Sequence, residues 1–212
     1  LLENIRDNLY GPIILSNLCK KYDIHLTYLG TGCIFNYDDN HSINSQIGFL
    51  ESDKPNFFGS SYSIVKGFTD RLMHNLFDNT VLNVRIRMPI SSDKSSRNFI
   101  TKITNYKKIC SMPNSMTVLD EIIPIIIDMS KNQTKGTINM TNPGVITHNE
   151  ILEIYKKYKA PEFQWENFSL EEQNNILSSK RSNNYLNTDR LQRLYPEINN
   201  IRDAILKIFT LK

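Results

Sequence analysis

The stretch IHLTYLGTGC, residues 24–33, decides the fold that we expect. It begins with apolar and β-branched residues typical of a strand and ends in small residues, with Thr31 and Cys33 among them. Upstream, over residues 2–20, apolar positions recur at helical spacing, although Gly11-Pro12 should loosen or kink that helix. A helix followed directly by such a strand is one repeat of an α/β sheet, in which sites form beyond the carboxyl ends of the strands. We therefore predict an α/β fold, with Thr31 and Cys33 at the edge of a site.

The rest of the chain continues this alternation of helices and strands. We predict, in chain order, an irregular polar loop over 36–58, a helix from about 60 to 75, a buried strand over 81–89, helices over 97–108 and 118–132, a short strand over 136–141, and a last helix over 202–209. Two capping boxes, beginning at Thr147 and Ser169, each predict the start of a further helix. No internal repeat or low-complexity tract interrupts the pattern, which indicates one α/β body.

Composition excludes several classes of protein. The 212 residues are 40% hydrophobic and 22% charged, which is ordinary for a globular protein that can bury a core. A net charge of +3 is too small to indicate a protein that binds duplex nucleic acid. The longest apolar run, residues 122–127, is too short to cross a bilayer, and the N-terminal residues lack the layout of a signal peptide. We expect a soluble protein with no nucleic-acid or membrane partner.

The cysteines and histidines indicate neither disulfides nor a metal site. The chain has 3 Cys and 4 His, widely spaced and without a Cys-x-x-Cys or His-Glu-x-x-His arrangement. An odd number of isolated cysteines is typical of reduced thiols. We predict a cytoplasmic protein that binds no metal.

Tyr62 and Lys66 are four residues apart where a helix is expected to begin. That spacing puts the phenol and the ammonium on one helical face, where the cation would lower the tyrosine pKa from about 10 toward neutral pH. Such a pair can give a proton to a carbonyl oxygen, and the Thr31 hydroxyl would be a second donor. The three residues suit reduction of a ketone by a hydride source. An isolated Tyr-x-x-x-Lys match is weak, since an exposed helical pair is its ordinary explanation.

The surrounding sequence strengthens this interpretation because several stretches resemble one known family, the nucleotide-rhamnose synthase/epimerase-reductases. The matching stretches are TGCIF (31–35), PNFFGS (55–60), RIRMPISSD (85–93), RNFITK (97–102), PNSMTVLDE (113–121), TNPG (141–144), HNEI (148–151), PEF (161–163) and RSNN (181–184). These enzymes are extended short-chain dehydrogenases/reductases. The resemblance implies a Rossmann-like parallel sheet with a smaller C-terminal substrate-binding region. It implies a bifunctional 3,5-epimerase/4-reductase that converts UDP- or dTDP-4-keto-6-deoxyglucose to nucleotide-L-rhamnose with NADPH, or with NADH.

Carried over by position, the resemblance assigns reductase roles to four residues. Thr31, Tyr62 and Lys66 match the reductase triad, and Tyr62 and Lys66 also contact the cofactor in this family. Asn8 matches the helix asparagine that steadies the cofactor side of the site in many relatives.

Cys33 and Lys102 match the family's epimerase acid/base pair. In a 4-keto sugar the ketone acidifies the protons on C3 and C5, so epimerisation needs a base on one face and an acid on the other. Without the resemblance, Cys33 would be interpreted as a small buried hydrophobe and Lys102 as a solvated cation.

Three residues are predicted to bind the substrate. Arg181 could clamp the nucleotide diphosphate through bidentate hydrogen bonds, and an exposed loop arginine is its alternative interpretation. Asn98 and Asn142 are expected to line the sugar-nucleotide pocket.

The sequence departs from the family pattern at the cofactor site. The family opens with a strand, a glycine-rich turn and a helix that cradles the cofactor pyrophosphate, and none of the 212 residues supplies them. We therefore expect an N-terminally truncated chain that would hold NADPH weakly. Residues 1–92 are expected to be the remaining part of the dinucleotide-binding domain, with the catalytic residues. Residues 93–212 are expected to contribute the sugar-nucleotide site and the closing helices.

Other functions remain open at this stage. A reductase-only dTDP-4-dehydrorhamnose reductase would share the triad, but Cys33 and Lys102 argue against it. A GDP-fucose synthase would need an additional histidine that no position matches. A non-catalytic sugar-nucleotide-binding relative would keep the pocket without the cofactor half. The resemblance also implies a 4,6-dehydratase upstream in the pathway and is compatible with a homodimer.

Overall fold

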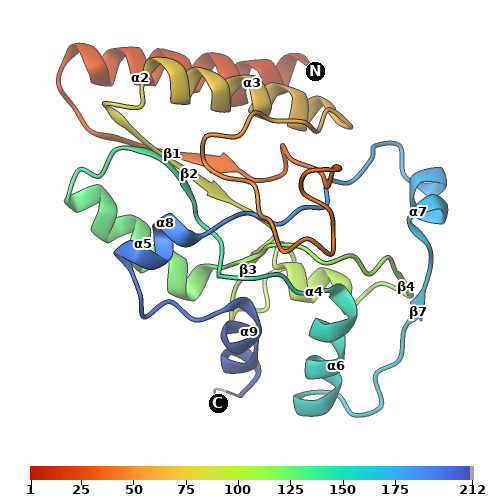
Figure 1. The fold of residues 1–212 in the computed structure, drawn as a ribbon. Coiled ribbons are helices and arrows are strands. Elements are labelled where there is room, and N and C mark those ends of the chain that lie inside the picture. Colours follow the sequence, from red (N-terminus) through yellow and green to blue (C-terminus); the bar gives the residue numbers. More distant parts are fainter. Residues whose placement is uncertain (211–212) are drawn as a thin grey trace.

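The computed structural model describes residues 1–210. Its centre is a parallel three-stranded sheet in the order β1-β2-β6, formed by β1 (Leu26–Thr31), β2 (Val81–Ile86) and β6 (Gly136–Asn139). Helices α2 (Gly11–Lys21) and α3 (Ser61–Leu76) cover one face, and α5 (Leu119–Lys131) and α8 (Asp189–Leu194) cover the other (Figure 1). The parallel α/β fold predicted from the sequence is confirmed.

Strand β2 shows why the sheet has this form. It is the central strand, and five of its six residues are buried, as expected for a strand with helices on both faces. Leu82 and Val84 pack into a core with residues of α5 and α8. Asn83 and Arg85, which alternate with them, instead hydrogen-bond Asp70 of α3. The period of two along the strand thus gives one apolar and one polar buried face.

The N-terminal helix is distorted just before Pro12, as the sequence predicts. It consists of α1 (Leu2–Ile5), a π-helical turn η1 (Arg6–Tyr10) and α2. Pro12 has no N–H to give to the carbonyl oxygen of Asn8 four residues earlier. The Thr69 hydroxyl of α3 donates to that oxygen instead, at 2.5 Å. The distortion therefore also joins the first helix to α3.

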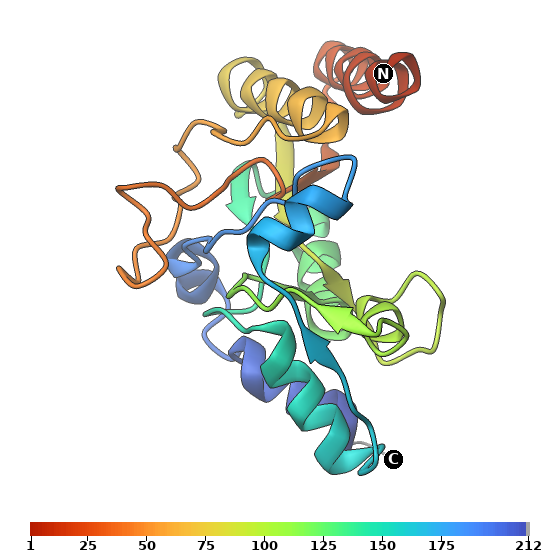
Figure 2. The same cartoon turned by 90° about the vertical axis from the view of Figure 1, so that its right-hand side faces the viewer.

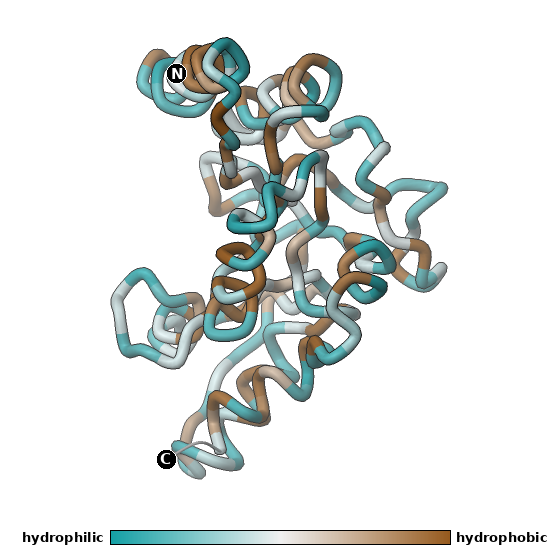
Figure 3. Tube along the Cα trace, turned by 90° about the vertical axis from the view of Figure 1, so that its left-hand side faces the viewer, coloured by the Kyte–Doolittle hydropathy of each residue, from teal (hydrophilic) through white to brown (hydrophobic). Residues whose placement is uncertain are grey.

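The remaining elements form an extension beyond the carboxyl ends of the central strands. They are β3 (Pro89–Ile90), α4 (Phe99–Ile103), β4 (Lys108–Ile109), β5 (Thr117–Val118), α6 (His148–Tyr158), β7 (Glu166–Asn167), α7 (Leu170–Ile176) and α9 (Ile201–Thr210). Helices α6 and α9 lie side by side at the end farthest from α2 and α3 (Figure 2). Apolar and polar positions alternate along these helices, as amphipathic packing requires (Figure 3). Their apolar faces build a second core, with Ile151, Ile205 and Phe209 among its members.

Most predicted elements are present, and the largest error lies after residue 97. The helix predicted over 97–108 is only α4, because Thr104 and Asn105 turn their side chains back onto the carbonyl oxygens of the preceding turn. The following residues form β4, which pairs with β7. Both predicted capping boxes are formed, at Thr147 and Ser169. The predicted division of the chain at residue 92 stays a prediction. The hydrophobic core around β2 contains residues from both sides of that position.

Candidate active site

The turn after β1 places Thr31 and Cys33 at the carboxyl edge of the sheet. Thr31 is paired in register with Ile86 of β2, and the next amide, Gly32 N–H, donates to the Ile86 carbonyl oxygen at 2.9 Å. The Thr31 hydroxyl is nearly buried and accepts a hydrogen bond from the Cys33 N–H at 3.1 Å. Cys33 itself is partly exposed and is a free thiol. Its place at the strand end agrees with the site position that the sequence predicts.

Helix α3 brings Tyr62 to the same turn. The helix begins after Ser60, whose hydroxyl accepts from the Ser63 N–H, so Tyr62 lies in its first turn. The phenol is 40% exposed, which leaves it accessible. Partial burial, and to a lesser extent the nearby Cys33 side chain, raise the pKa of Tyr62, while the Thr31 hydroxyl acts in the opposite direction. The structure therefore brings Thr31, Cys33 and Tyr62 together, and keeps the phenol protonated at neutral pH.

Lys66 lies one helical turn further along α3, and its ammonium is hydrogen-bonded to residues of β1. It is only 5% exposed, and its ammonium donates to the Tyr28 hydroxyl at 2.5 Å and to the Leu29 carbonyl oxygen at 2.9 Å. Burial lowers the pKa of Lys66 to about 8, against the opposing effect of Asp70. The expectation that Lys66 lowers the pKa of Tyr62 is wrong for this structure, because the ammonium is held by Tyr28. Sequence reasoning missed Tyr28, which comes from a strand distant in sequence.

Asn8 lies in the π-helical turn, alongside α3. Its side-chain amide donates to Asn4 Oδ1 at 3.4 Å, and its main-chain carbonyl accepts from Thr69. Because Thr69 is one turn beyond Val65 and Lys66 on α3, this bond fixes the first helix against α3. The cofactor-steadying role of Asn8 stays a prediction.

The other predicted site residues differ in whether their side chains are hydrogen-bonded within the protein. Lys102 on α4 and Arg181 are exposed, and neither side chain has a hydrogen bond or an ion pair within residues 1–210. Asn98 caps α4 by accepting from Ile100 N–H, and its amide donates to the carbonyl oxygens of Ser91 and Asp93.

Asn142 is also held inside the protein. Its oxygen accepts from Val118 N–H at 2.8 Å, and its amide donates to Glu121 and to the Asn199 carbonyl. Both Asn98 and Asn142 are thus hydrogen-bonded within the protein, and contact of either with a substrate stays a prediction.

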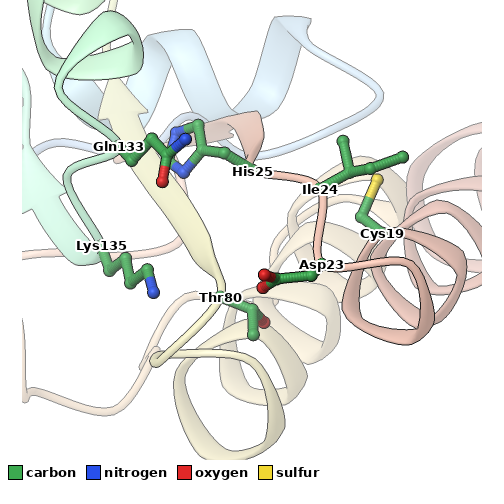
Figure 4. Close-up of a pocket in the computed structure, with 7 residues that line it drawn as sticks. All are labelled: Cys19, Asp23, Ile24, His25, Thr80, Gln133 and Lys135. Carbon is green, nitrogen blue, oxygen red and sulfur yellow. The ribbon is translucent and has the colours of Figure 1, made fainter.

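The structure has two hollows in different places. An open hollow of about 670 Å³ lies beside the start of α3, between the loop of residues 56–59 and the segment of residues 174–180. Its size is in the range of small-molecule sites. Figure 4 shows the second hollow, lined by His25, Thr80 and Lys135 among others, which directly precede the three central strands. Since it lies at the amino ends of the strands, it is remote from Thr31 and Cys33.

Neither a metal centre nor a membrane-spanning helix is found in the part of the chain that the structure describes. No three His, Cys, Asp or Glu side chains gather closely enough to hold a metal ion over residues 1–210. Within the same range no helix is both long and apolar enough to cross a membrane.

Comparison with known proteins identifies relatives of this chain. No protein-family model matches it. The L780 protein of Acanthamoeba polyphaga mimivirus is 59% identical over 208 residues, which are 98% of this chain and 71% of that protein. The crystal structure of L780, described as a UDP-rhamnose synthase, matches with a TM-score of 0.91 at 58% identity, over 97% of this chain and 72% of that one.

Two plant enzymes extend the comparison. A bifunctional dTDP-4-dehydrorhamnose 3,5-epimerase/dTDP-4-dehydrorhamnose reductase of Arabidopsis thaliana is 47% identical over 207 residues, 97% of this chain and 68% of that protein. A trifunctional UDP-glucose 4,6-dehydratase/UDP-4-keto-6-deoxy-D-glucose 3,5-epimerase/UDP-4-keto-L-rhamnose-reductase of the same plant is 50% identical over 206 residues, 97% of this chain and 31% of that protein. With this fold and these relatives, the chain belongs to the nucleotide-rhamnose epimerase/reductase family of extended short-chain dehydrogenases/reductases.

Proposed function

We propose that this protein converts a nucleotide-linked 4-keto-6-deoxy-D-glucose to nucleotide-L-rhamnose by 3,5-epimerisation and 4-reduction. The observation that carries the proposal is the proximity of Cys33, a free and partly exposed thiol, to the hydroxyl groups of Thr31 and Tyr62 at the carboxyl edge of the sheet. A reductase alone needs only the two hydroxyl groups. The thiol beside them adds a group that can remove a proton from a carbon next to a ketone.

In the reduction, Tyr62 gives its proton to O4 of the sugar, and Thr31 donates a second hydrogen bond to that oxygen. The raised pKa of Tyr62 supports this direction, because the phenol is protonated at neutral pH and can act as an acid. Hydrogen bonds from both hydroxyl groups stabilise the negative charge that develops on the oxygen.

In the epimerisation, Cys33 exchanges a proton with the carbon atoms next to the ketone, and Lys102 serves the opposite face of the sugar. The support for Cys33 is its position beside Thr31 and Tyr62. The support for Lys102 is its match to the family, together with an ammonium that no side chain binds within residues 1–210. This role requires the sugar to lie between Lys102 on α4 and the turn at Cys33.

The residues at the carboxyl end of β1 fit the nicotinamide half of a cofactor. Lys66 uses two of its three N–H donors, on Tyr28 and Leu29, and pairs with no carboxylate within residues 1–210, so one donor is available for a ribose hydroxyl. When bound, NADPH supplies the hydride for the reduction. We propose NADPH on the family resemblance, with NADH as the alternative, and Asn8 steadies this side of the site. Residues 1–212 contain no glycine-rich turn for the pyrophosphate.

We further propose a UDP- or dTDP-linked sugar as the substrate. It would lie in the open hollow beside α3, whose rim includes Lys180 next to the exposed Arg181, as a diphosphate requires. In this proposal residues 1–92 carry the catalytic groups apart from Lys102, and residues 93–212 complete the substrate site, with Asn98 and Asn142 lining the sugar-nucleotide pocket. A 4,6-dehydratase upstream, a cytoplasmic location and a homodimer are also proposed. The upstream 4,6-dehydratase is supported by the name of the trifunctional relative, which includes that activity.

The test is a pair of assays on the natural full-length protein and its Cys33→Ala variant. The wild-type protein should convert UDP- or dTDP-4-keto-6-deoxyglucose to the L-rhamnose nucleotide with oxidation of NADPH. The variant should fail on that substrate yet still reduce the pre-epimerised 4-keto-L-rhamnose nucleotide. Wild-type activity on the pre-epimerised sugar alone would instead indicate a reductase. Binding of both sugar nucleotides without turnover would indicate a non-catalytic relative.

A further inference from the structure

Two buried polar side chains, from a segment distant in sequence, bind the turn that carries Cys33. Asn184 is 0% exposed, and its amide donates to the carbonyl oxygens of Gly32 and Phe35 at 2.9 and 2.8 Å. The nearly buried Ser182 hydroxyl donates to the same Phe35 oxygen at 2.6 Å. These two carbonyl groups come just before and shortly after Cys33 in the chain. The Asn184–Ser182 pair therefore holds the main chain on both sides of the thiol.

Arg87 fixes the direction in which the Asn184 amide points. A guanidinium can only donate hydrogen bonds, and Arg87 Nε contacts Asn184 Oδ1 at 3.0 Å. The amide oxygen therefore faces Arg87, and the amide nitrogen faces the turn. The main chain of Asn184 has its own partners, since its N–H donates to Asn114 Oδ1 and its carbonyl accepts from Ser115 N–H, both at 3.0 Å. A substitution of the side chain thus removes the bonds to the turn and leaves these main-chain bonds in place.

Cys33 contributes little to its own placement. Its N–H donates to Thr31 Oγ1 at 3.1 Å, and its thiol has no hydrogen-bond partner within residues 1–210. The bond that closes the turn, from Phe35 N–H to the Gly32 carbonyl, is long at 3.3 Å. The turn also packs closely against the distant segment, because a Cβ on Gly32 would lie 2.6 Å from Leu186 Cδ1. The place of the thiol therefore depends on residues 182–186.

The groups assigned to the reduction are held by other contacts. Thr31 ends β1 and is paired in register with Ile86 of β2, and Gly32 N–H donates to the Ile86 carbonyl oxygen at 2.9 Å. Tyr62 is carried by the first turn of α3. Loss of the Asn184–Ser182 pair would therefore release the turn at Cys33 while Thr31 and Tyr62 stay on the sheet and the helix.

We propose that Asn184 and Ser182 are positioning residues that set the place of the Cys33 thiol for epimerisation. This inference rests on the proposed role of Cys33. Reacting atoms must lie about 3–3.5 Å apart, and a misplacement of about 1 Å can lower a rate about 100-fold. A thiol on a turn meets that requirement only if the turn is held, and the pair holds it through both flanking carbonyl groups.

The test compares two buried asparagines that have the same bonding pattern. Asn139 is also 0% exposed, and its Oδ1 accepts from Arg85 Nη1 at 3.4 Å. Its amide donates to the carbonyl oxygens of Phe49 and Asn187, which lie outside the Cys33 turn. Asn184→Asp and Asn139→Asp each keep the shape of the side chain and the oxygen that faces the arginine. Each replaces the donor to two carbonyl groups by an oxygen, so only the location of the change differs.

The first measurement is amide hydrogen exchange at pH 7, followed by mass spectrometry, on the peptide that contains residues 31–37 of the full-length protein. Exchange should be about tenfold faster in Asn184→Asp, because two hydrogen bonds to the turn are lost. In Asn139→Asp it should stay at the wild-type rate. Ser182→Ala removes one bond and leaves those of Asn184, so exchange should rise only about threefold.

The second measurement compares the two half-reactions in the same variants. Solvent deuterium entry at C3 and C5 of the 4-keto sugar should fall about 10- to 100-fold in Asn184→Asp, while reduction of the pre-epimerised sugar should change less than about threefold. Ser182→Ala should shift the ratio of the two rates in the same direction by about threefold. Asn139→Asp should leave the ratio at its wild-type value, since it does not touch the turn.

A folded Asn184→Asp variant with wild-type amide exchange over residues 31–37, or with equal loss of both half-reactions, would overturn the proposal. If that variant does not fold, Ser182→Ala decides in the same way, because it removes a single hydroxyl group. Failure of the proposed function gives a different result. In that case Cys33→Ala would still admit deuterium at C3 and C5, while the peptide of residues 31–37 would still exchange faster in Asn184→Asp.

Discussion

Replacing Asp70 with Asn should destabilise the protein strongly, because it removes the counter-ion of a fully buried arginine. Arg85 and Asp70 have side chains 0% and 3% exposed, and the carboxylate also accepts from Asn83 Nδ2 at 2.9 Å. Breaking a buried pair by removing one partner costs about 3–5 kcal/mol. Since the free energy of unfolding of a domain is about 5–15 kcal/mol, this is a large part of the total.

The assay is urea unfolding of the natural full-length protein, followed by circular dichroism, with two matched comparisons. The exposed pair Arg6–Asp7 has the same shortest N–O distance, 2.7 Å, so Asp7→Asn removes an ion pair of equal length from solvent and should change stability immeasurably. The double variant Asp70→Leu with Arg85→Met removes both buried charges and should recover most of the loss. If Asp70→Asn cost less than about 1 kcal/mol, or no more than Asp7→Asn, the reasoning from burial would be refuted.

Three further predictions test separate parts of the structure. Thr69→Val should lower the free energy of unfolding by about 1–3 kcal/mol in urea, because the Asn8 carbonyl oxygen loses its hydrogen-bond donor. Adding Pro12→Ala should recover part of this loss, because alanine supplies a backbone N–H to the same oxygen. No recovery in the double variant would contradict the role given to proline. Because the pKa of His148 is lowered to about 4 in the folded protein, the unfolded state binds more protons than the folded state between pH 6.5 and 4, and the free energy of unfolding falls as the pH falls through that window. His148→Gln should make this loss smaller. An identical dependence of stability on pH in the variant would contradict the prediction. Tyr62→Phe should abolish NADPH oxidation yet still allow solvent deuterium to enter C3 and C5, as followed by NMR; loss of exchange would place Tyr62 in both half-reactions.

Local patterns predicted the parts of the fold that depend on neighbours in sequence. The strand at 26–31, the kink before Pro12 and the capping boxes at Thr147 and Ser169 each follow from a few adjacent residues, and each is present. The helix bearing Tyr62 and Lys66 is also present, because its N-cap Ser60 and its apolar face are both local signals.

The electrostatics of the site could not be predicted in this way, because they depend on residues distant in sequence. Lys66 bonds Tyr28, 38 residues earlier, which is why its expected effect on Tyr62 is not seen. Arg87 donates to Asn114, Ser182 and Asn184, and only the folded chain shows that these uncharged residues, and no carboxylate within residues 1–210, are its partners. The composition of a chain cannot show which arginine is buried, since arginine is ordinarily a surface residue.

The most direct test of the central claim is one reaction in D₂O, with the natural full-length protein, NADPH and UDP- or dTDP-4-keto-6-deoxyglucose. We predict an L-rhamnose nucleotide that carries deuterium at both C3 and C5, because two epimerisations through solvent-exchanging groups precede the reduction. A reduced 6-deoxy sugar without deuterium at those carbons, or no product at all, would contradict the account.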